Sequence, residues 1–152
     1  MTASDAVFVA KGIAPTDYST EIVKEISIME PGLILKTATV LLALGALGGL
    51  LMAGMRFAGR PHPPAWLAML HGVLAASAIT LLAYAAATIG LPVLAIVALA
   101  LFLVAAAGGA VLNLGYHWKM IALPKWLIVV HAGIAVLGFV LLLIATWVPS
   151  RG

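Results

Sequence analysis

Two histidines, His71 and His131, lie in stretches of the chain that are otherwise almost entirely apolar. Each follows a proline by seven residues, and the pattern P-x-W-L-x-x-x-H is the same at 64–71 and at 124–131. A neutral imidazole has one ring nitrogen free to bind a metal ion, and it can exchange a proton near neutral pH. Because a polar side chain is costly in an apolar segment, this pair is the first candidate for chemistry.

The composition of the 152 residues excludes a water-soluble globular domain. Hydrophobic residues make up 64% of the chain and charged residues 9%, so the apolar surface exceeds what a single soluble core can bury. All five acidic residues precede residue 31, which excludes a carboxylate site for Mg²⁺ or Ca²⁺ in the apolar stretches. The absence of Cys excludes disulfides, thiolate metal sites and cysteine nucleophiles. We therefore expect an integral membrane protein.

Four apolar segments are each long enough to cross the hydrocarbon core of a bilayer, which takes about 20 helical residues. They cover residues 33–55, 65–87, 91–115 and 125–148. The connections between them are short, and Pro and Gly mark the turns. The sequence therefore predicts an all-α, up-down-up-down four-helix bundle over residues 33–148.

The first 32 residues are polar and are expected to form a separate N-terminal segment. Within it, apolar residues recur at helical spacing over 17–29, and Pro31-Gly32 follows. This pattern predicts a short amphipathic helix that lies on the membrane surface or against a partner and ends at Pro31-Gly32. A frayed polar tail is the alternative.

The Lys and Arg residues near the ends of the apolar segments predict the orientation of the chain. The loops after the first and third segments hold four of them, and the opposite side holds three. The positive-inside rule then places the basic loops in the cytoplasm and both termini outside, in what we expect to be a bacterial inner membrane. The net charge of +3 includes no run of Lys and Arg, so no nucleic-acid partner is expected.

The two halves of the predicted bundle resemble each other when the sequence is shifted by 60 positions. The repeats cover about 33–87 and 93–147, and both have the same orientation. We therefore expect a symmetry axis along the membrane normal, and any site on that axis would receive one contribution from each half. The matches that carry the repeat are Gly48-Gly49 with Gly108-Gly109, Pro64 with Pro124, Trp66-Leu67 with Trp126-Leu127, and His71 with His131.

The second and fourth segments run in the same direction, so His71 and His131 lie at the same depth, about 10 Å from the start of each helix. Two imidazoles that face each other across the centre of a bundle are an axial ligand pair for a haem iron. Small residues at this level leave room for a flat ligand, and basic residues at the nearer membrane face can pair with its propionates. The small residues are Gly48, Gly49, Gly108, Gly109, Ala75 and Ala135, and the basic residues are Arg56, Arg60, Lys119 and Lys125.

Other interpretations of these residues stay open. Small residues in membrane helices usually serve close packing, and Gly45 with Gly49 forms a GxxxG pair. The two intramembrane histidines can also be a duplicated packing feature, each hydrogen-bonded to a neighbouring helix. His62 and His117, which lie in the loops, are expected to be solvated, and a metal-binding pair is the less favoured alternative. A small transporter is disfavoured because the apolar segments hold no carboxylate.

With His71 and His131 placed in a four-helix bundle, residues 33–148 resemble the small membrane b-type cytochromes, broadly the cytochrome b561-like class. The resemblance implies a haem b held by histidines between helices, and electron exchange with quinol or a redox protein partner. Many members of that class carry two haems, whereas this chain offers one histidine pair, so one haem b per chain is expected. The leading hypothesis is an electron-transfer protein or subunit of a larger complex or homo-oligomer, without catalytic residues of its own. The alternative is a haem-free scaffold subunit.

Overall fold

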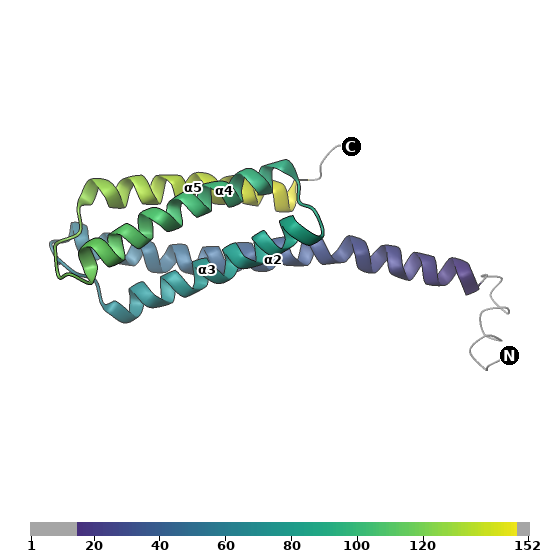
Figure 1. The fold of residues 1–152 in the computed structure, drawn as a ribbon, viewed down its shortest axis with the longest axis horizontal. Helices are drawn as coiled ribbons and strands as arrows, with labels where there is room; N and C mark the ends of the chain where they lie inside the picture. The colour runs from purple at the N-terminus through teal and green to yellow at the C-terminus, as the bar shows by residue number, and fades with distance from the viewer. Residues whose placement is uncertain (1–14, 149–152) are drawn as a thin grey trace.

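The computed structural model describes the backbone of residues 15–148 and the side chains of residues 32–148. It contains α2 (Pro15–Phe57), α3 (Ala65–Thr88), α4 (Val93–Ala110) and α5 (Lys125–Trp147), and α4 continues into the π-helical segment η1 (Val111–His117). Over these residues the fold is all-α (Figure 1).

Four helices are long and apolar enough to cross a membrane. They cover Gly32–Phe57, Ala65–Thr88, Val93–His117 and Lys125–Trp147. These bounds agree with the four predicted segments to within a few residues, so the predicted four-helix membrane bundle is confirmed as an architecture. Large aliphatic side chains cover the outside of the bundle, as a lipid-facing surface requires.

Proline and glycine determine where the helices begin and end. Pro64, Pro92 and Pro124 stand directly before α3, α4 and α5. Proline suits a helix start because it lacks the N–H that would have no partner there, and its φ is already helical. At the other end of α3, Gly90 has φ +83, and its N–H donates to the carbonyl oxygen of Ala85 at 3.0 Å. This left-handed residue closes the helix and allows the short turn into α4.

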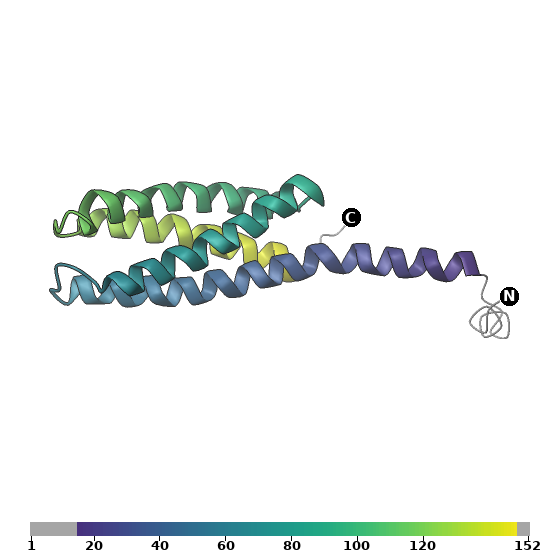
Figure 2. The same ribbon diagram turned by 60° about the horizontal axis from the view of Figure 1, so that its bottom comes forward.

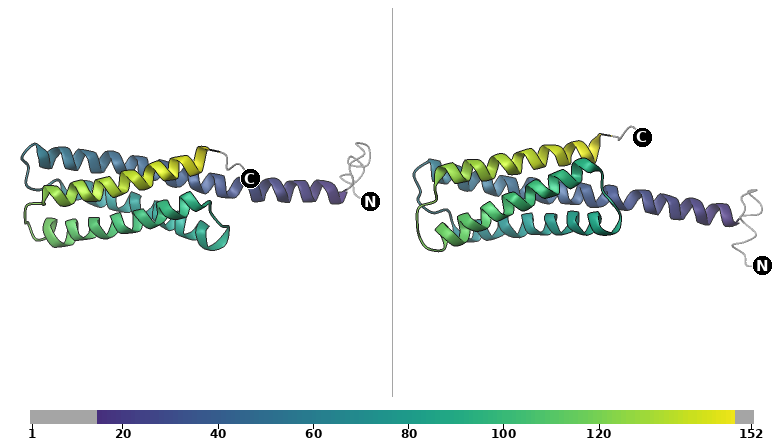
Figure 3. Two further views of the ribbon diagram at one scale, coloured as in Figure 1. Left: turned by 90° about the horizontal axis from the view of Figure 1, so that it is seen from above. Right: turned by 45° about the horizontal axis from the view of Figure 1, so that its top comes forward.

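The bundle consists of two helical hairpins. Contacts are most extensive within the α2–α3 pair and within the α4–α5 pair, and the hairpins meet along α2–α5 and α3–α4. Figure 2 shows the two hairpins as layers. The loop between α2 and α3 and the loop between η1 and α5 lie at the same end of the bundle, which we call the loop end. Each helix packs chiefly against the two helices beside it in the bundle. Helices α3 and α5 therefore lie at opposite corners (Figure 3).

Two separate hydrophobic clusters form the core. The larger, which includes Ala78, Leu82 and Leu142, lies toward the end with the α3–α4 turn. The smaller, of Leu112, Leu123 and Ile128, lies toward the other end, beside the two longer loops. Alanines stand among the leucines of the buried core, and their small side chains let the helix backbones approach closely.

The prediction that a short N-terminal helix ends at Pro31-Gly32 is wrong. Helix α2 runs without interruption over Pro15–Phe57, 43 residues, and its first part extends beyond the bundle (Figure 1). A proline inside a helix costs about 3 kcal/mol because one backbone hydrogen bond is lost. The backbone hydrogen bonds of the helical turns before and after Pro31 outweigh that cost, so the helix continues through this residue. The predictions for residues 1–14 lie outside the described residues.

The third apolar segment differs from prediction in its last turns. The α-helix ends at Ala110, and Val111–His117 is wound as a π-helix, with the Trp118 N–H donating to the carbonyl oxygen of Asn113 at 2.8 Å. A π-helical segment has more residues per turn than an α-helix, so it changes the direction of every side chain that follows. Hydrophobic periodicity carries no indication of this change.

Candidate functional site

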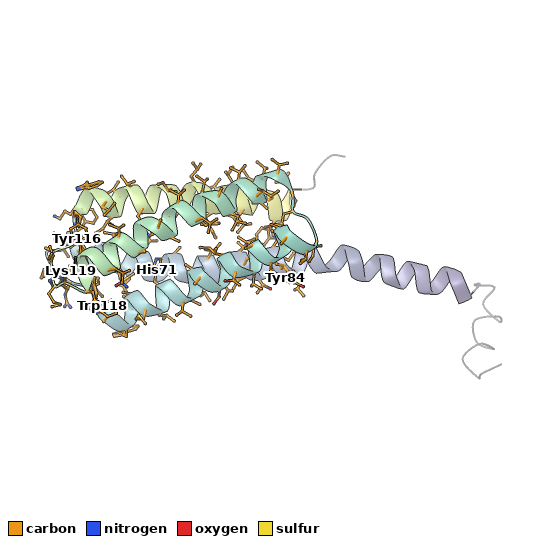
Figure 4. All side chains as sticks on the ribbon, in the orientation of Figure 1. His71, Tyr84, Tyr116, Trp118 and Lys119 are labelled. Carbon is orange, nitrogen blue, oxygen red and sulfur yellow. The ribbon has the colours of Figure 1, made fainter. Side chains whose placement is uncertain are left out.

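His71 on α3 and His131 on α5 meet in the interior between the two hairpins. Their ring centroids are 6.2 Å apart, and the ring planes are inclined by 74°. Both side chains are half-buried. Figure 4 labels His71, which lies toward the loop end of the bundle, the end that also carries Tyr116 and Lys119. The structure therefore brings together the two histidines that the sequence singled out, from diagonally opposite helices.

Each imidazole is hydrogen-bonded to the backbone of the other helix in its own hairpin. Nδ1 of His71 lies 2.7 Å from the carbonyl oxygen of Gly45, and Nδ1 of His131 lies 2.8 Å from the carbonyl oxygen of Ala105. A carbonyl oxygen only accepts, so each Nδ1 carries the proton and donates it. Nε2 of each ring then keeps its lone pair. This is the state in which a histidine binds a metal ion, with the other ring nitrogen held by a carbonyl group.

Four glycines lie level with the histidines along the bundle: Gly48, Gly49, Gly108 and Gly109. They lie against the histidine side chains and do not surround a separate space. A Cβ atom on Gly49 would lie 3.1 Å from Cε1 of His71, and one on Gly109 would lie 3.2 Å from Cε1 of His131. At Gly48 and Gly108 a Cβ atom would be in ordinary contact, 3.8 Å from His71 Cβ and from His131 Nδ1 respectively. The small residues were predicted to leave room for a flat ligand. In the structure, Gly49 and Gly109 let each imidazole lie close against the neighbouring helix.

The alanines one turn further along the same helices have a similar position in both hairpins. Ala75 follows His71 by four residues and Ala135 follows His131 by four, and both are half-buried. One further turn along α5, a Cβ atom on Gly138 would lie 3.2 Å from Cε1 of Phe102. Gly138 therefore serves the close packing of α5 against α4.

The basic residues gather at the loop end, as expected from the sequence, and two of them join the hairpins. Nε of Arg56, at the end of α2, donates to the carbonyl oxygen of Leu123 at 2.8 Å. Nζ of Lys125 lies 5.4 Å from the centroid of the Phe57 ring, within cation–π range. Arg60 and Lys119 are exposed. All four cations thus lie on the membrane face nearer the histidine pair.

The histidine pair separates the two hydrophobic clusters of the core. Along α5, Ile128 of the smaller cluster precedes His131, and Leu142 of the larger cluster follows it. Between these clusters, Gly49 and Gly109 lie against the rings, and Gly45 and Ala105 bind them through backbone carbonyl groups. The polar groups of the pair are therefore enclosed by apolar layers on both sides.

Sequence reasoning missed the two carbonyl groups that hold the imidazoles. Gly45 and Ala105 each precede their histidine by 26 residues, and they are themselves 60 positions apart, the same shift that aligns the halves. Nothing in the sequence singles these two residues out, because every residue carries a backbone acceptor.

His62 and His117, predicted to be solvated, are half-buried, and one ring nitrogen of each is shielded from solvent. Their rings lie 6.2 Å apart, and both Nδ1 atoms are buried without a hydrogen-bond partner. His62 lies in the loop between α2 and α3, and His117 ends η1, 55 positions further along the chain, so only the packing of the hairpins brings them together.

The chain was compared with known proteins at three levels. No family model, no curated protein and no solved structure matches it.

Proposed function

We propose that this chain is a membrane electron-transfer protein or redox subunit, in which His71 and His131 hold one haem b between the two hairpins. The observation that carries the proposal is the geometry of the pair: two imidazoles at opposite corners of the bundle, each with Nδ1 bound to a carbonyl oxygen and Nε2 free. The resemblance to small membrane b-type cytochromes points the same way.

The spacing of the two rings fits a single metal ion between them. An imidazole nitrogen binds a metal at about 2 Å, so the centres of two rings on opposite sides of one ion are about 6 Å apart. The observed separation is 6.2 Å, and the ring planes are inclined by 74°. The plane of a porphyrin held by this pair would lie between the hairpins, whose mutual contacts are less extensive than the contacts within each hairpin.

The chain's own residues account for the properties that such a site needs. The haem supplies one-electron chemistry at its iron. His71 and His131 would hold the group from two sides through Nε2. The carbonyl groups of Gly45 and Ala105 orient the two rings and increase the electron density on Nε2, which favours the oxidised iron. The apolar clusters on both sides exclude water from the pair.

The position of the pair determines where electrons would be exchanged. Both histidines lie about 10 Å from the loop ends of their helices, whereas the hydrocarbon core is about 30 Å thick. We place the electron partner, a quinol or a redox protein, at the loop face, where Arg56, Arg60, Lys119 and Lys125 gather. We place the chain in a bacterial inner membrane, with these loops in the cytoplasm and both termini outside. It would act within a larger complex or a homo-oligomer.

The test is the visible spectrum of the protein purified in detergent after expression with added haem. We expect the sharp bands of a reduced, six-coordinate, low-spin b haem. The variants His71→Ala and His131→Ala should each lose this spectrum, and the matched controls His62→Ala and His117→Ala should keep it. A folded but colourless wild type would overturn the proposal.

A second candidate is a haem-free scaffold subunit of a larger membrane complex. Two observations favour it. The imidazoles already fill the space beside Gly49 and Gly109, and the first part of α2 extends beyond the bundle, where a partner can reach it (Figure 1). A colourless wild type whose thermal unfolding midpoint falls in His71→Ala and His131→Ala would support this function, because the histidines would then act only through packing.

A further inference from the structure

A second histidine pair lies among the loops, outside the proposed haem site. His62 belongs to the loop between α2 and α3, and His117 is the last residue of η1. Their ring centroids are 6.2 Å apart, with the ring planes inclined by 81°. Both side chains are half-buried, and Nδ1 of each is shielded from solvent.

Neither Nδ1 atom has a hydrogen-bond partner. Among the residues whose side chains are described, 32–148, these two are the only buried side-chain nitrogen or oxygen atoms without one. Leaving one such atom unsatisfied costs about 1–3 kcal/mol, so a folded protein rarely keeps it without a compensating bond. Two of them in neighbouring rings make this pair the candidate for a ligand site.

The backbone on both sides of the pair is constrained. His62 stands between Pro61 and Pro63, and a residue before proline is restricted to an extended conformation. His117 closes a π-helical segment, a form that is rare and frequent at functional sites. Three residues later, Met120 has φ +56, a left-handed conformation that is strained for a residue with a side chain. These features limit the freedom of the backbone that carries the two rings.

The two loops are also fastened to each other. The Arg56 to Leu123 hydrogen bond joins the end of α2 to the loop before α5, and Lys125 lies over Phe57. Both contacts connect the hairpin that carries His62 with the hairpin that carries His117. The distance between the two rings is therefore set by the fold rather than by free loop motion.

We propose that His62 and His117 form a site for a monovalent copper ion, held between their two Nδ1 atoms. Imidazole nitrogen suits copper, zinc, iron and nickel, but within residues 32–148 no group of three His, Cys, Asp or Glu side chains could hold a metal ion. Zinc in proteins almost always takes four ligands, so two imidazoles alone do not satisfy it. A monovalent copper ion is satisfied by two nitrogen ligands in a nearly straight line.

The ring spacing agrees with this coordination. With metal–nitrogen distances of about 2 Å, a straight arrangement places the ring centres about 6 Å apart, whereas a tetrahedral angle would bring them closer. The observed value is 6.2 Å. A haem is a poor occupant, because Nδ1 is the ring nitrogen nearer the backbone and a macrocycle bound to it would collide with the loops. The copper site is independent of the proposed haem function.

The experiment measures binding of Cu⁺ to the purified full chain in detergent, under reducing conditions and in competition with a coloured Cu⁺ chelator. We expect one ion per chain, with X-ray absorption that shows two nitrogen neighbours. Binding should be lost in His62→Leu and His117→Leu and retained in the controls His71→Leu and His131→Leu. Absence of binding to the wild type would overturn the proposal, as would binding that depends on the second set of variants instead.

Methionine variants keep the test informative where a leucine variant unfolds. A thioether is a good ligand for monovalent copper, and Met and Leu are similar in size. His117→Met should therefore keep Cu⁺ binding while His117→Leu loses it, with similar thermal unfolding midpoints. If the folded methionine variant loses copper as completely as the leucine variant, or if Zn²⁺ competes on equal terms in the wild type, the assignment to monovalent copper is wrong.

Discussion

The two histidine pairs have the same ring spacing but differ in which nitrogen is available. In His71 and His131, Nδ1 is bound to a carbonyl oxygen. In His62 and His117, Nδ1 is buried and unpaired. The hydrogen bond made by one ring nitrogen determines whether the other nitrogen donates a proton or offers a lone pair. The two pairs therefore present different nitrogens to a ligand at the same ring spacing. Under our two proposals, the intramembrane pair would bind a large cofactor through Nε2, and the loop pair would bind a single ion through Nδ1.

The glycines beside the histidines provide the first prediction. Gly49→Ala and Gly109→Ala each place a Cβ atom within 3.1–3.2 Å of an imidazole carbon, closer than normal contact. Each ring must shift, and we expect a loss of stability of about 1–3 kcal/mol from overpacking. The thermal unfolding midpoint in detergent should fall. Where haem is bound, its spectrum should change in both variants.

Gly54 is the matched control for this prediction. It lies on the same helix as Gly49, is exposed, and has nothing within 4 Å of an added Cβ atom. Gly54→Ala should be neutral or slightly stabilising, by up to about 1 kcal/mol, because alanine favours a helix over glycine. Equal midpoints for Gly49→Ala and Gly54→Ala would show that His71 does not pack against α2 in this way.

At the scale of elements, the hairpins are held together at the loop end by few polar contacts. The hydrogen bond from Arg56 to the Leu123 carbonyl oxygen is half-buried and joins α2 to the loop before α5. We predict that Arg56→Ala lowers stability by about 1.5–3 kcal/mol, the usual range for a hydrogen bond with one charged partner. Arg60→Ala, at an exposed position of the same loop, should stay within about 0.5 kcal/mol of the wild type. Similar unfolding midpoints for the two variants would contradict this role of Arg56.

The continuity of α2 through Pro31 leads to a third prediction. The chain has no Cys, so two introduced cysteines can carry spin labels without a background signal. For labels at positions 24 and 36, a continuous helix at 1.5 Å per residue predicts a separation of about 18 Å between the backbone positions, with a narrow distribution. A broad distribution in pulsed electron resonance would instead indicate a break at Pro31-Gly32.

At the scale of the whole molecule, stability depends on how closely the helices approach one another. The outer surface of the bundle is lined by large aliphatic residues, and the interior combines leucines with alanines. In a bilayer the lipid tails are as apolar as the core, so burial of apolar surface gives little driving force between helices. Close packing and the few hydrogen bonds between helices must therefore drive the association of the helices.

Orientation in the membrane is the prediction at this scale. Single cysteines in place of Gly59 and Ala122 should react with an impermeant reagent only from the cytoplasmic side, and one in place of Thr88 only from outside. The physical reason is the excess of Lys and Arg in the two loops after the first and third spans. Labelling on the opposite sides would leave both histidine pairs in place and move the electron partner to the other compartment.

The sequence by itself determined the four-helix architecture and the depth of the intramembrane histidines. Hydrophobic length predicts a span because a bilayer has a definite thickness, and prolines before α3 and α5 set where each helix begins. Counting residues from those starts then places His71 and His131 level with each other. The haem that this pair suggests, and the symmetry of the repeat, stay predictions.

Tertiary structure alone decided the contacts that depend on how the hairpins pack. His62 and His117 are far apart in the sequence, and no period or motif links them, so only the packed loops place their rings together. The carbonyl groups of Gly45 and Ala105 are likewise invisible in a sequence, because every residue has one. The π-helical turn before His117 and the helical passage through Pro31 were missed for a related reason. Both are local departures from the favoured backbone, and the energy that permits them comes from packing and from hydrogen bonds formed elsewhere in the fold.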